Sequence, residues 1–448
     1  MYRIRIRTLL TREVAIPEAT AIFAISFLVS AALGILRQSV FNAVIGTGQD
    51  AAAFYAAFRL PETLTSLIAG GALSNALIPV LIDVRRQRGA ADEHRLIAIV
   101  WGALLATTIV AALIGTIAAP TFVAALIAPG FDAPTAALTV RLTQLLLLQT
   151  IPLAAVSIGI AVLNSRNQFL LTGLAIALHN LAQIAGIAAT ALDGRLGVYG
   201  PALGILVDVM VELGILWAGL RANGYRLTPS WNPHDRLLRR VVGLLVPNGL
   251  SAGVNYLGAV VDTAFGSLAP ERGAVPAIYN AALLVGLPVR LFGTALAQAA
   301  FPRFAAAASD GDAETLISGV RRALVTTMAL GVVAALGFWL VGRWLIALLF
   351  ERGKFDASAG DLTFALLLAF AIGLPAYVGT EVLSRALIAL QDTRTPLFTN
   401  CGQLGVRLLI CALFTPTVGA ATIPLAFAIS SALETIALAA VFRWKLRR

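Results

Sequence analysis

Three arginines lie deep inside apolar segments of the sequence, where a positive charge must be either solvated or neutralised. These are Arg37, Arg59 and Arg290. Arg37 and Arg59 each lie roughly 13 to 15 Å from the nearest loop if the segments are helical. An arginine at the bilayer centre costs about 3 kcal/mol on insertion scales, so each needs water or a partner. Because a guanidinium binds phosphate or carboxylate through paired hydrogen bonds, arginines that line a wet cavity would bind an anionic headgroup.

Ion pairing within the helices is the alternative use of these charges. Glu62 follows Arg59 by three residues, which places both side chains on one helix face. We favour a cavity role for Arg37 and Arg290, and leave Arg59 with Glu62 open between a cavity and a salt bridge. Asn75 is a further cavity candidate, although an asparagine inside a membrane helix more often bonds a neighbouring helix.

Three carboxylates inside apolar segments are candidates for coupling to Na⁺ or H⁺. Asp208 and Glu212 are spaced i,i+4, which places both carboxylates on one helix face. They would either hold a cation or proton or form an ion pair with a neighbouring arginine, and we favour the ion pair with arginine. Asp262 is the other candidate, and Arg407 is its candidate countercharge. If the chain moves a solute across the membrane, the membrane potential is an alternative to Na⁺ or H⁺ as the driving force.

Signals for covalent chemistry, cofactors and metals are missing from the sequence. The two cysteines, Cys401 and Cys411, stand in one apolar segment without nearby histidines, and the three histidines are scattered. We find no phosphate loop or nucleophile elbow. We therefore expect neither an enzyme nor a bound cofactor or metal.

Membrane helices must position these residues. A chain of 448 residues that is 59% hydrophobic and 12% charged cannot cover a soluble globule of its size with polar side chains. Many of its apolar runs reach the roughly 20 residues that cross a bilayer. The sequence predicts an all-α membrane protein with about twelve transmembrane helices, at 18–45, 52–83, 95–119, 134–164, 168–192, 198–221, 237–266, 274–301, 317–341, 358–390, 395–415 and 418–443.

Arginine placement predicts the orientation of the chain. Basic residues are concentrated in the N-terminal segment, in alternate loops and in the C-terminal tail, which places both termini in the cytoplasm. The net charge of +10 then indicates contact with anionic membrane lipids and not with nucleic acid. The basic N-terminal segment lacks the pattern of a cleaved signal peptide.

An internal repeat divides the predicted spans into two halves of six. Phe131, Asp132 and Thr139 recur as Phe355, Asp356 and Thr363 at an offset of 224. Because six is even, the two repeats would share one orientation and surround a central cavity. The predicted regions are an N-terminal segment at 1–17, an N-lobe at 18–222, a linker at 223–236, a C-lobe at 237–443 and a basic tail at 444–448.

Five motifs stand out along the chain: SAALGILRQ at 30–38, AFYAAFRLPETL at 53–64, GGALSNALIPVL at 70–81, LFERGKF at 349–355 and EVLSRALIALQDTRTP at 381–396. They resemble the MurJ (MviN) family of lipid II flippases in the multidrug/oligosaccharidyl-lipid/polysaccharide exporter superfamily. The resemblance implies a bacterial inner-membrane protein whose cationic cavity holds the pyrophosphate of a lipid-linked glycan while two lobes alternate in access. Arg37 is similar to a cavity arginine of the family, and Asp262 to an acidic cation-site residue.

The sequence departs from the family pattern at several cavity positions. Charged residues of the family are replaced by Ala31, Ala52, Thr65 and Leu283. Arg290 stands about two turns after Leu283 on nearly the same face, where its charge would lie roughly 10 Å further along the axis. Family members usually have fourteen spans, and the missing pair lines a groove for the lipid tail, so we expect altered tail handling.

The sequence therefore predicts a flippase for a lipid-linked pyrophosphate glycan precursor, lipid II of peptidoglycan synthesis, working by alternating access. One alternative is a Na⁺- or H⁺-coupled exporter of another amphiphile or drug. Another is a non-transporting scaffold with a degenerate cavity that assembles with cell-wall synthesis proteins.

Overall fold

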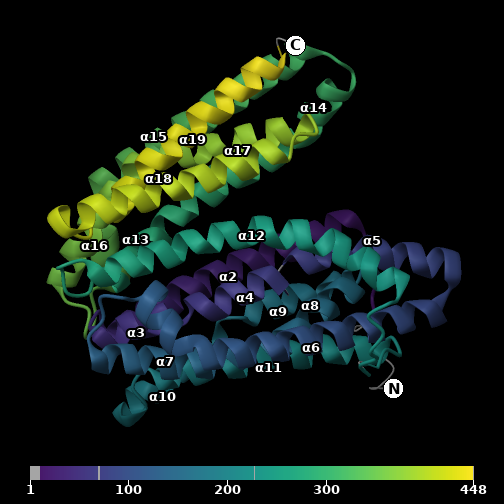
Figure 1. Cartoon of the computed structure of the whole chain (residues 1–448), viewed down its shortest axis with the longest axis horizontal. Coiled ribbons are helices and arrows are strands. Elements are labelled where there is room, and N and C mark those ends of the chain that lie inside the picture. Colours follow the sequence, from purple (N-terminus) through teal and green to yellow (C-terminus); the bar gives the residue numbers. More distant parts are fainter. Residues whose placement is uncertain (1–10, 69–70, 227, 447–448) are drawn as a thin grey trace. The chain divides into compact units, whose positions relative to one another are not determined.

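The computed structural model describes residues 11–68, 71–226 and 228–446; within these ranges the side chains of residues 16, 68, 71, 72, 75, 246–252, 254 and 255 are outside the description. Every regular element in the described ranges is a helix (Figure 1). The expected all-α fold is therefore confirmed.

Contacts divide the chain into two compact units. Unit 1 comprises the described residues up to Gly46, together with Ala56–Ala125 and Asp132–Ala259, and unit 2 comprises Thr47–Tyr55, Leu126–Phe131 and the residues from Val260 onward. The change within α12, at Ala259, comes after the linker expected at 223–236. The lobe boundaries read from the sequence stay predictions.

The helices of unit 1 follow chain order with short connections. They are α2 (Ile16–Ile45), α4 (Arg59–Ile68), α5 (Gly71–Arg88), α6 (Ala90–Phe122), α7 (Ala133–Leu147), α8 (Thr150–Asn164), α9 (Phe169–Leu178), α10 (Leu181–Leu192), the 3₁₀ turn η2 (Gly194–Leu196) and α11 (Tyr199–Ala222). Three elements contain residues of both units: α3 (Gln49–Ala57), the π-helix η1 (Val123–Ile127) and α12 (Arg236–Leu268).

Unit 2 continues with α13 (Ala274–Pro288), the π-helix η3 (Val289–Thr294), α14 (Ala295–Ser309), α15 (Ala313–Phe350), α16 (Ala357–Ile372), α17 (Leu374–Ala389), α18 (Arg394–Val418) and α19 (Thr422–Leu446). In Figure 1, α15, α17, α18 and α19 run alongside one another.

Nine helical segments in the described part of the chain are long and apolar enough to cross a membrane, or ten if the α16–α17 pair, bent by 45°, forms one span. The chain is thus a multi-pass membrane protein. The other expected spans, 52–83 and 237–266, are also mainly helical and contain parts of α3 with α4 and α5, and of α12. Both segments include residues or side chains that lie outside the description.

Local structure repeats at the offset that the sequence repeat predicts. Asp132 caps α7 by accepting a hydrogen bond from the backbone N–H of Thr135 at 3.2 Å. Asp356 caps α16 in the same way, accepting from the N–H of Ala359 at 2.9 Å. Each cap satisfies an otherwise unpaired donor of the first helical turn. Both helices are followed by a break before the next helix, α8 or α17, which supports an internal duplication.

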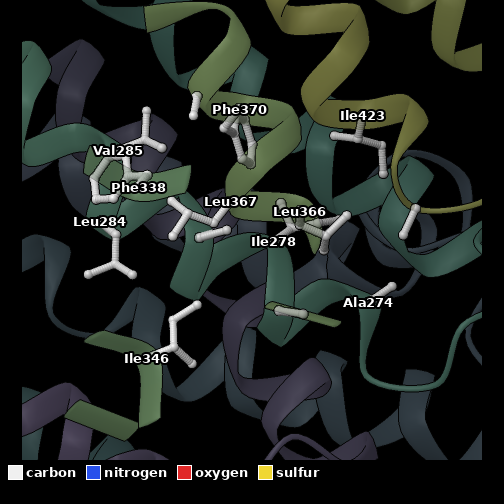
Figure 2. Packing of buried hydrophobic residues seen from close by; sticks show 14 of the residues in the cluster. Ala274, Ile278, Leu284, Val285, Phe338, Ile346, Leu366, Leu367, Phe370 and Ile423 are labelled. Atoms are coloured by element: carbon white, nitrogen blue, oxygen red, sulfur yellow. The ribbon is translucent and has the colours of Figure 1, made fainter. Parts of the chain in front are cut away.

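Apolar side chains fill the interior of unit 2 between α13, α15, α16 and α19. Figure 2 shows Leu284, Val285 and Phe338 on one side of this cluster and Leu366 and Ile423 on another. Many other large apolar side chains of the long helices are exposed. Exposed apolar surface on helices of this length is the surface that faces lipid.

One end of unit 1 is held by a charge cluster around Glu93, whose side chain is fully buried. Its carboxylate accepts hydrogen bonds from Arg85 and from Arg166, the latter at 3.4 Å, and from the hydroxyl of Tyr225 at 2.8 Å. Arg85 also donates to the backbone carbonyl of Ser165 at 3.2 Å. We call these residues the Glu93 cluster. It ties α5, α6, the α8–α9 turn and the segment after α11 together.

Burial and the nearby Glu93 carboxylate raise the pKa of Tyr225 above its ordinary value. The phenol therefore stays protonated at neutral pH and remains a hydrogen-bond donor. Arg166 lies over the same ring, with its guanidinium carbon 4.9 Å from the ring centroid. Such a cation–π contact adds to the stability of the cluster.

The turn at 391–396, read from the sequence as a family motif, has a structural function. Gln391 has φ of 61°, a left-handed conformation that side chains other than glycine seldom adopt. Asp392 follows it and accepts hydrogen bonds from the backbone N–H of Thr395 at 3.0 Å and from its hydroxyl at 2.6 Å. Lys445 of α19 forms an ion pair with the same carboxylate at 2.9 Å. The turn thus starts α18 and binds it to the end of α19.

We expect the contribution of Asp392 to stability to disappear in acid. Burial alone would raise the pKa of its carboxyl, but the Thr395 hydrogen bonds and Lys445 outweigh it and lower the pKa from 3.8 to about 2. A lowered folded-state pKa gives stability, here at most about 2 kcal/mol, that is fully present above pH 4 and is lost as the pH falls through about 2. Unfolding of the wild type and Asp392→Asn should therefore differ at pH 6 and converge towards pH 2. Asp310→Asn, at an exposed position, is the control. A difference in stability between the wild type and Asp392→Asn that does not change with pH would show that the charge of Asp392 is not its source.

Candidate functional site

Arg37 is held by a hydrogen bond to a neutral side chain. It lies half-buried on α2, and its Nη1 donates to Oε1 of Gln183 on α10 at 2.9 Å. A neutral acceptor leaves the positive charge of the guanidinium uncompensated at this contact. Arg37 therefore keeps the capacity to bind an anion.

Gln183 connects Arg37 to a buried carboxylate. Its Nε2 donates to Oδ2 of Asp208 on α11 at 3.0 Å, and Nδ1 of His179 lies 2.9 Å from the same oxygen. The Asp208 side chain is 3% exposed and that of His179 is 46% exposed. Glu212, one turn after Asp208, is within electrostatic range of both Asp208 and His179. A continuous polar chain thus runs from Arg37 to an accessible imidazole.

The helix that carries His179 and Gln183 is interrupted beside this series of polar side chains. α9 ends at Leu178 and α10 begins at Leu181, so His179 and Asn180 form a turn between them. Asn180 donates to the backbone carbonyl of Ser30 on α2 at 3.1 Å, the interhelical role expected of such asparagines. The interruption is short, since His179 and Asn180 keep right-handed helical dihedral angles and the two helices form one candidate span, Phe169–Leu192.

Unit 2 has a polar contact at a corresponding place, with different charges. Arg407 of α18 donates to the carboxylate of Asp262 on α12, and both side chains are largely buried. The Arg407 guanidinium also lies 4.3 Å from the ring centroid of Phe427. Asp262 follows Arg37 at an offset of 225, and Arg407 follows Gln183 at 224. In the predicted repeats, these positions fall in the first and fifth helices of each half.

The remaining candidates are arranged differently. Arg59 forms an ion pair with Glu62 on its own helix, with Nη1 3.1 Å from Oε2. Arg290 lies exposed in η3, and its side chain has no ion pair or hydrogen bond within the described part of the chain. π-helical turns such as η3 occur frequently at functional sites. Asn75 belongs to α5, and its side chain lies outside the described residues.

The positions that depart from the family pattern are also in the helices. Ala31 is exposed on α2, Ala52 is buried in α3, and Thr65 on α4 and Leu283 on α13 are half-buried. No group of three His, Cys, Asp or Glu side chains in the described ranges has an arrangement that could hold a metal ion.

His179 and Gln183 are the site residues that the sequence did not reveal. The pair favoured for Asp208 was an arginine, whereas its direct partners are an amide and an imidazole. The i,i+4 spacing of His179 and Gln183 was a usable signal, since it places both on one helix face. Their nearness to Asp208 depends on the rotation of α10 against α11.

The model of the family described as "Lipid II flippase MurJ" matches residues 41–447. Curated relatives include the "Probable lipid II flippase MurJ" of Rhizobium meliloti (strain 1021), 28% identical over 336 residues, which are 73% of this chain and 62% of the relative. The "Lipid II flippase MurJ" of Burkholderia cenocepacia is 28% identical over 336 residues, 74% of this chain and 65% of the relative. The match thus spans less than two thirds of either relative.

Solved structures show the same fold. A lipid II flippase MurJ in an inward closed conformation matches with a TM-score of 0.81 at 19% identity, over 94% of this chain and 87% of the other. An inward-facing multidrug resistance MATE family transporter of the MOP superfamily matches with a TM-score of 0.74 at 16% identity, over 92% and 94%. At these identities the likeness concerns the fold alone.

Proposed function

Because the chain belongs to the lipid II flippase MurJ family, we propose that it moves a lipid-linked pyrophosphate glycan, lipid II, across the bacterial cytoplasmic membrane. The family match across nearly all of both units is the observation that carries this proposal. The movement requires no covalent chemistry. Alternating access between the two faces of the membrane is the mechanism that accords with two compact units in one chain.

Two arginines supply the chemistry for the anionic part of this substrate. Arg37 is bonded to an amide and Arg290 is exposed, whereas Arg59 is neutralised by Glu62. A pyrophosphate diester carries two negative charges and many acceptor oxygens, which suit guanidinium groups. We propose Arg37 and Arg290 as substrate-binding residues, with Arg59, Glu62 and Asn75 as secondary ones.

The membrane arrangement that goes with this function has twelve spans. In this proposal the helices at 52–83 and 237–266 complete the set, the two repeats share one orientation, and both termini lie in the cytoplasm. The basic ends of the spans then meet anionic lipid headgroups. The proposed location is the bacterial inner membrane, where cell-wall synthesis proteins are the expected neighbours.

We propose that Asp262 is the partner of Arg407 in an ion pair and not a ligand for a mobile cation. The guanidinium of Arg407 already provides a positive charge at its carboxylate. A fixed internal cation at this position would replace a mobile one in unit 2. We therefore place proton or ion coupling at Asp208 and Glu212 in unit 1.

The decisive experiment is complementation in cells depleted of their own lipid II flippase. We expect the wild-type chain to restore growth and Arg37→Ala to fail, because the anion loses a charge-assisted contact. In a reconstituted flipping assay Arg37→Ala should slow transport at least about tenfold, equivalent to one lost charged hydrogen bond of 1.5 kcal/mol or more.

Two variants control this experiment. Arg37→Lys keeps the charge without the planar fork and should be intermediate. Arg86→Ala removes an exposed arginine at the end of α5 and should behave as wild type. Failure of the correctly inserted wild-type chain to complement would reject lipid II as the substrate, and complementation by Arg37→Ala would reject the role of Arg37.

A further inference from the structure

Unit 1 has an ionisable pair at a place where unit 2 has a neutral one. His179 and Asp208 meet in unit 1, with Nδ1 2.9 Å from Oδ2. At offsets of 224 and 222, Gln403 and Ser430 meet in unit 2, where Nε2 of Gln403 donates to Oγ of Ser430 at 2.9 Å. In unit 2 the corresponding helices, α18 and α19, therefore pack together with a neutral pair at this position. Ionisable residues inside spans are costly, so their presence in unit 1 indicates a function.

The helix break is also specific to unit 1. α18, the counterpart of the α9–α10 pair, is continuous from Arg394 to Val418. The α9–α10 break occurs at His179 itself, and Nε2 of Gln183 also donates to the backbone carbonyl of His179 at 3.2 Å. The imidazole is thus positioned by an interruption that the duplicated helix lacks.

Groups of both signs lie within electrostatic range of His179. They are the guanidinium of Arg37 on α2 and the acids Asp208 and Glu212 on α11. Protonation of the imidazole places a positive charge directly beside the carboxylate of Asp208, 2.9 Å from its Oδ2.

No other described helix packed against α11 adds a charge at this site. α8 contains no charged residue. The one charged side chain of α7, Arg141, is exposed and donates to the carbonyl of Ala137 on its own helix.

His179 is accessible to solvent, and its partner Asp208 is not. The imidazole is about half-exposed, whereas the carboxylate of Asp208 is buried. A proton can therefore reach the ring and be stabilised there by a carboxylate that solvent does not screen. Histidine is also the side chain whose ordinary titration range includes physiological pH.

We propose that His179, Asp208 and Glu212 form a proton-binding site in unit 1, and that Gln183 links proton binding to anion binding at Arg37. The amide of Gln183 accepts from Arg37 and donates to Asp208, so a change of charge at one end alters the electrostatic environment at the other. Proton and anion then strengthen each other's binding by the same factor. The identity of the anion as a lipid-linked diphosphate rests on the proposed function, but the proton site does not.

The proton site is tested without any substrate. The chain has three histidines, so nuclear magnetic resonance of histidine-labelled protein gives three ring signals, and His179→Gln assigns one of them. We expect the His179 signal to titrate between pH 5 and 8. Its midpoint should move by about one pH unit or more in Asp208→Ser, while the signals of His94 and His234 stay unchanged. A His179 ring in one protonation state over this range, or a midpoint unaffected by Asp208→Ser, overturns the proton site.

The link to Arg37 is tested with a short-chain isoprenyl diphospho-sugar, a diphosphate diester whose own charge is constant between pH 6 and 8. Wild-type protein should bind it at least about fivefold more tightly at pH 6 than at pH 8. The double variant His179→Gln with Asp208→Ser introduces the neutral pair of unit 2 and should bind with an affinity independent of pH. Gln183→Leu should likewise lose the pH dependence.

These outcomes separate the two proposals. Binding by the wild type that does not change with pH, or a Gln183→Leu variant that retains the full pH dependence, overturns the link. Absence of binding contradicts Arg37 as an anion site and therefore the link, while the histidine titration still decides the proton site. Elution of each variant at the wild-type position in gel filtration checks that it folds. Lipid II transport itself is decided by complementation alone.

Discussion

Replacement of Glu93 by alanine should destabilise the protein by about 3 to 5 kcal/mol, the cost of removing one partner from a buried ion pair. The carboxylate is fully buried and serves Arg85, Arg166 and the hydroxyl of Tyr225 at once. Its loss leaves two guanidinium groups and a phenol without their shared acceptor. Denaturant unfolding in detergent micelles measures the effect, which would also appear as a lower midpoint of thermal unfolding.

An exposed ion pair provides the matched comparison for Glu93. Asp83 on α5 pairs with Arg240 on α12 at 2.9 Å, and both side chains are substantially exposed. Asp83→Ala should cost no more than about 1 kcal/mol, because water and salt screen the pair. Glu93→Gln keeps two acceptor lone pairs but loses the charge, so it should fall between the two. Equal effects of Glu93→Ala and Asp83→Ala would show that the cluster is not a major source of stability.

Arg407→Leu should be the second strongly destabilising change, again by about 3 to 5 kcal/mol. The substitution leaves the carboxylate of Asp262 in a largely buried position without its guanidinium partner. It also removes the cation–π contact with Phe427. Thermal unfolding in detergent should show a much larger loss than for Arg394→Leu, which removes an exposed arginine from the start of the same helix.

The double variant distinguishes an ion pair from simple packing. If Arg407 mainly neutralises Asp262, then Asp262→Leu combined with Arg407→Leu should be more stable than Arg407→Leu alone, because no unpaired charge remains. Additive losses from the two substitutions would show that they stabilise unit 2 independently. The result also bears on ion coupling, since a strongly coupled pair leaves Asp262 little capacity to hold a mobile cation.

Several levels of the fold could be predicted from residue types alone. Long apolar runs gave a multi-pass helical membrane protein, because lipid admits only segments that satisfy their own backbone hydrogen bonds. The repeat was visible at Asp132 and Asp356, since a helix start needs a capping acceptor and both copies use the same one. The salt bridge of Arg59 with Glu62 was one of two readings, and local helix geometry decided it.

The candidate site was predicted only in part. A charge inside a span is unusual and is a property of a single residue, so the sequence indicates Arg37, Asp208 and Glu212. It also indicates Asp262 and Arg407 as charge and countercharge, and they form an ion pair. It does not indicate His179 and Gln183, since neither a neutral amide nor a lone histidine is unusual in a sequence.

What the sequence determined by itself is the membrane class and the family resemblance, and it predicts the internal repeat; all three depend on residue types and their order along the chain. Only the tertiary structure decided which polar side chains meet. Arg37 and Gln183 are separated by 146 residues and Asp262 and Arg407 by 145. The physical reason is that hydropathy depends on residues within one segment, whereas an interhelical contact depends on how each helix is rotated against its neighbour.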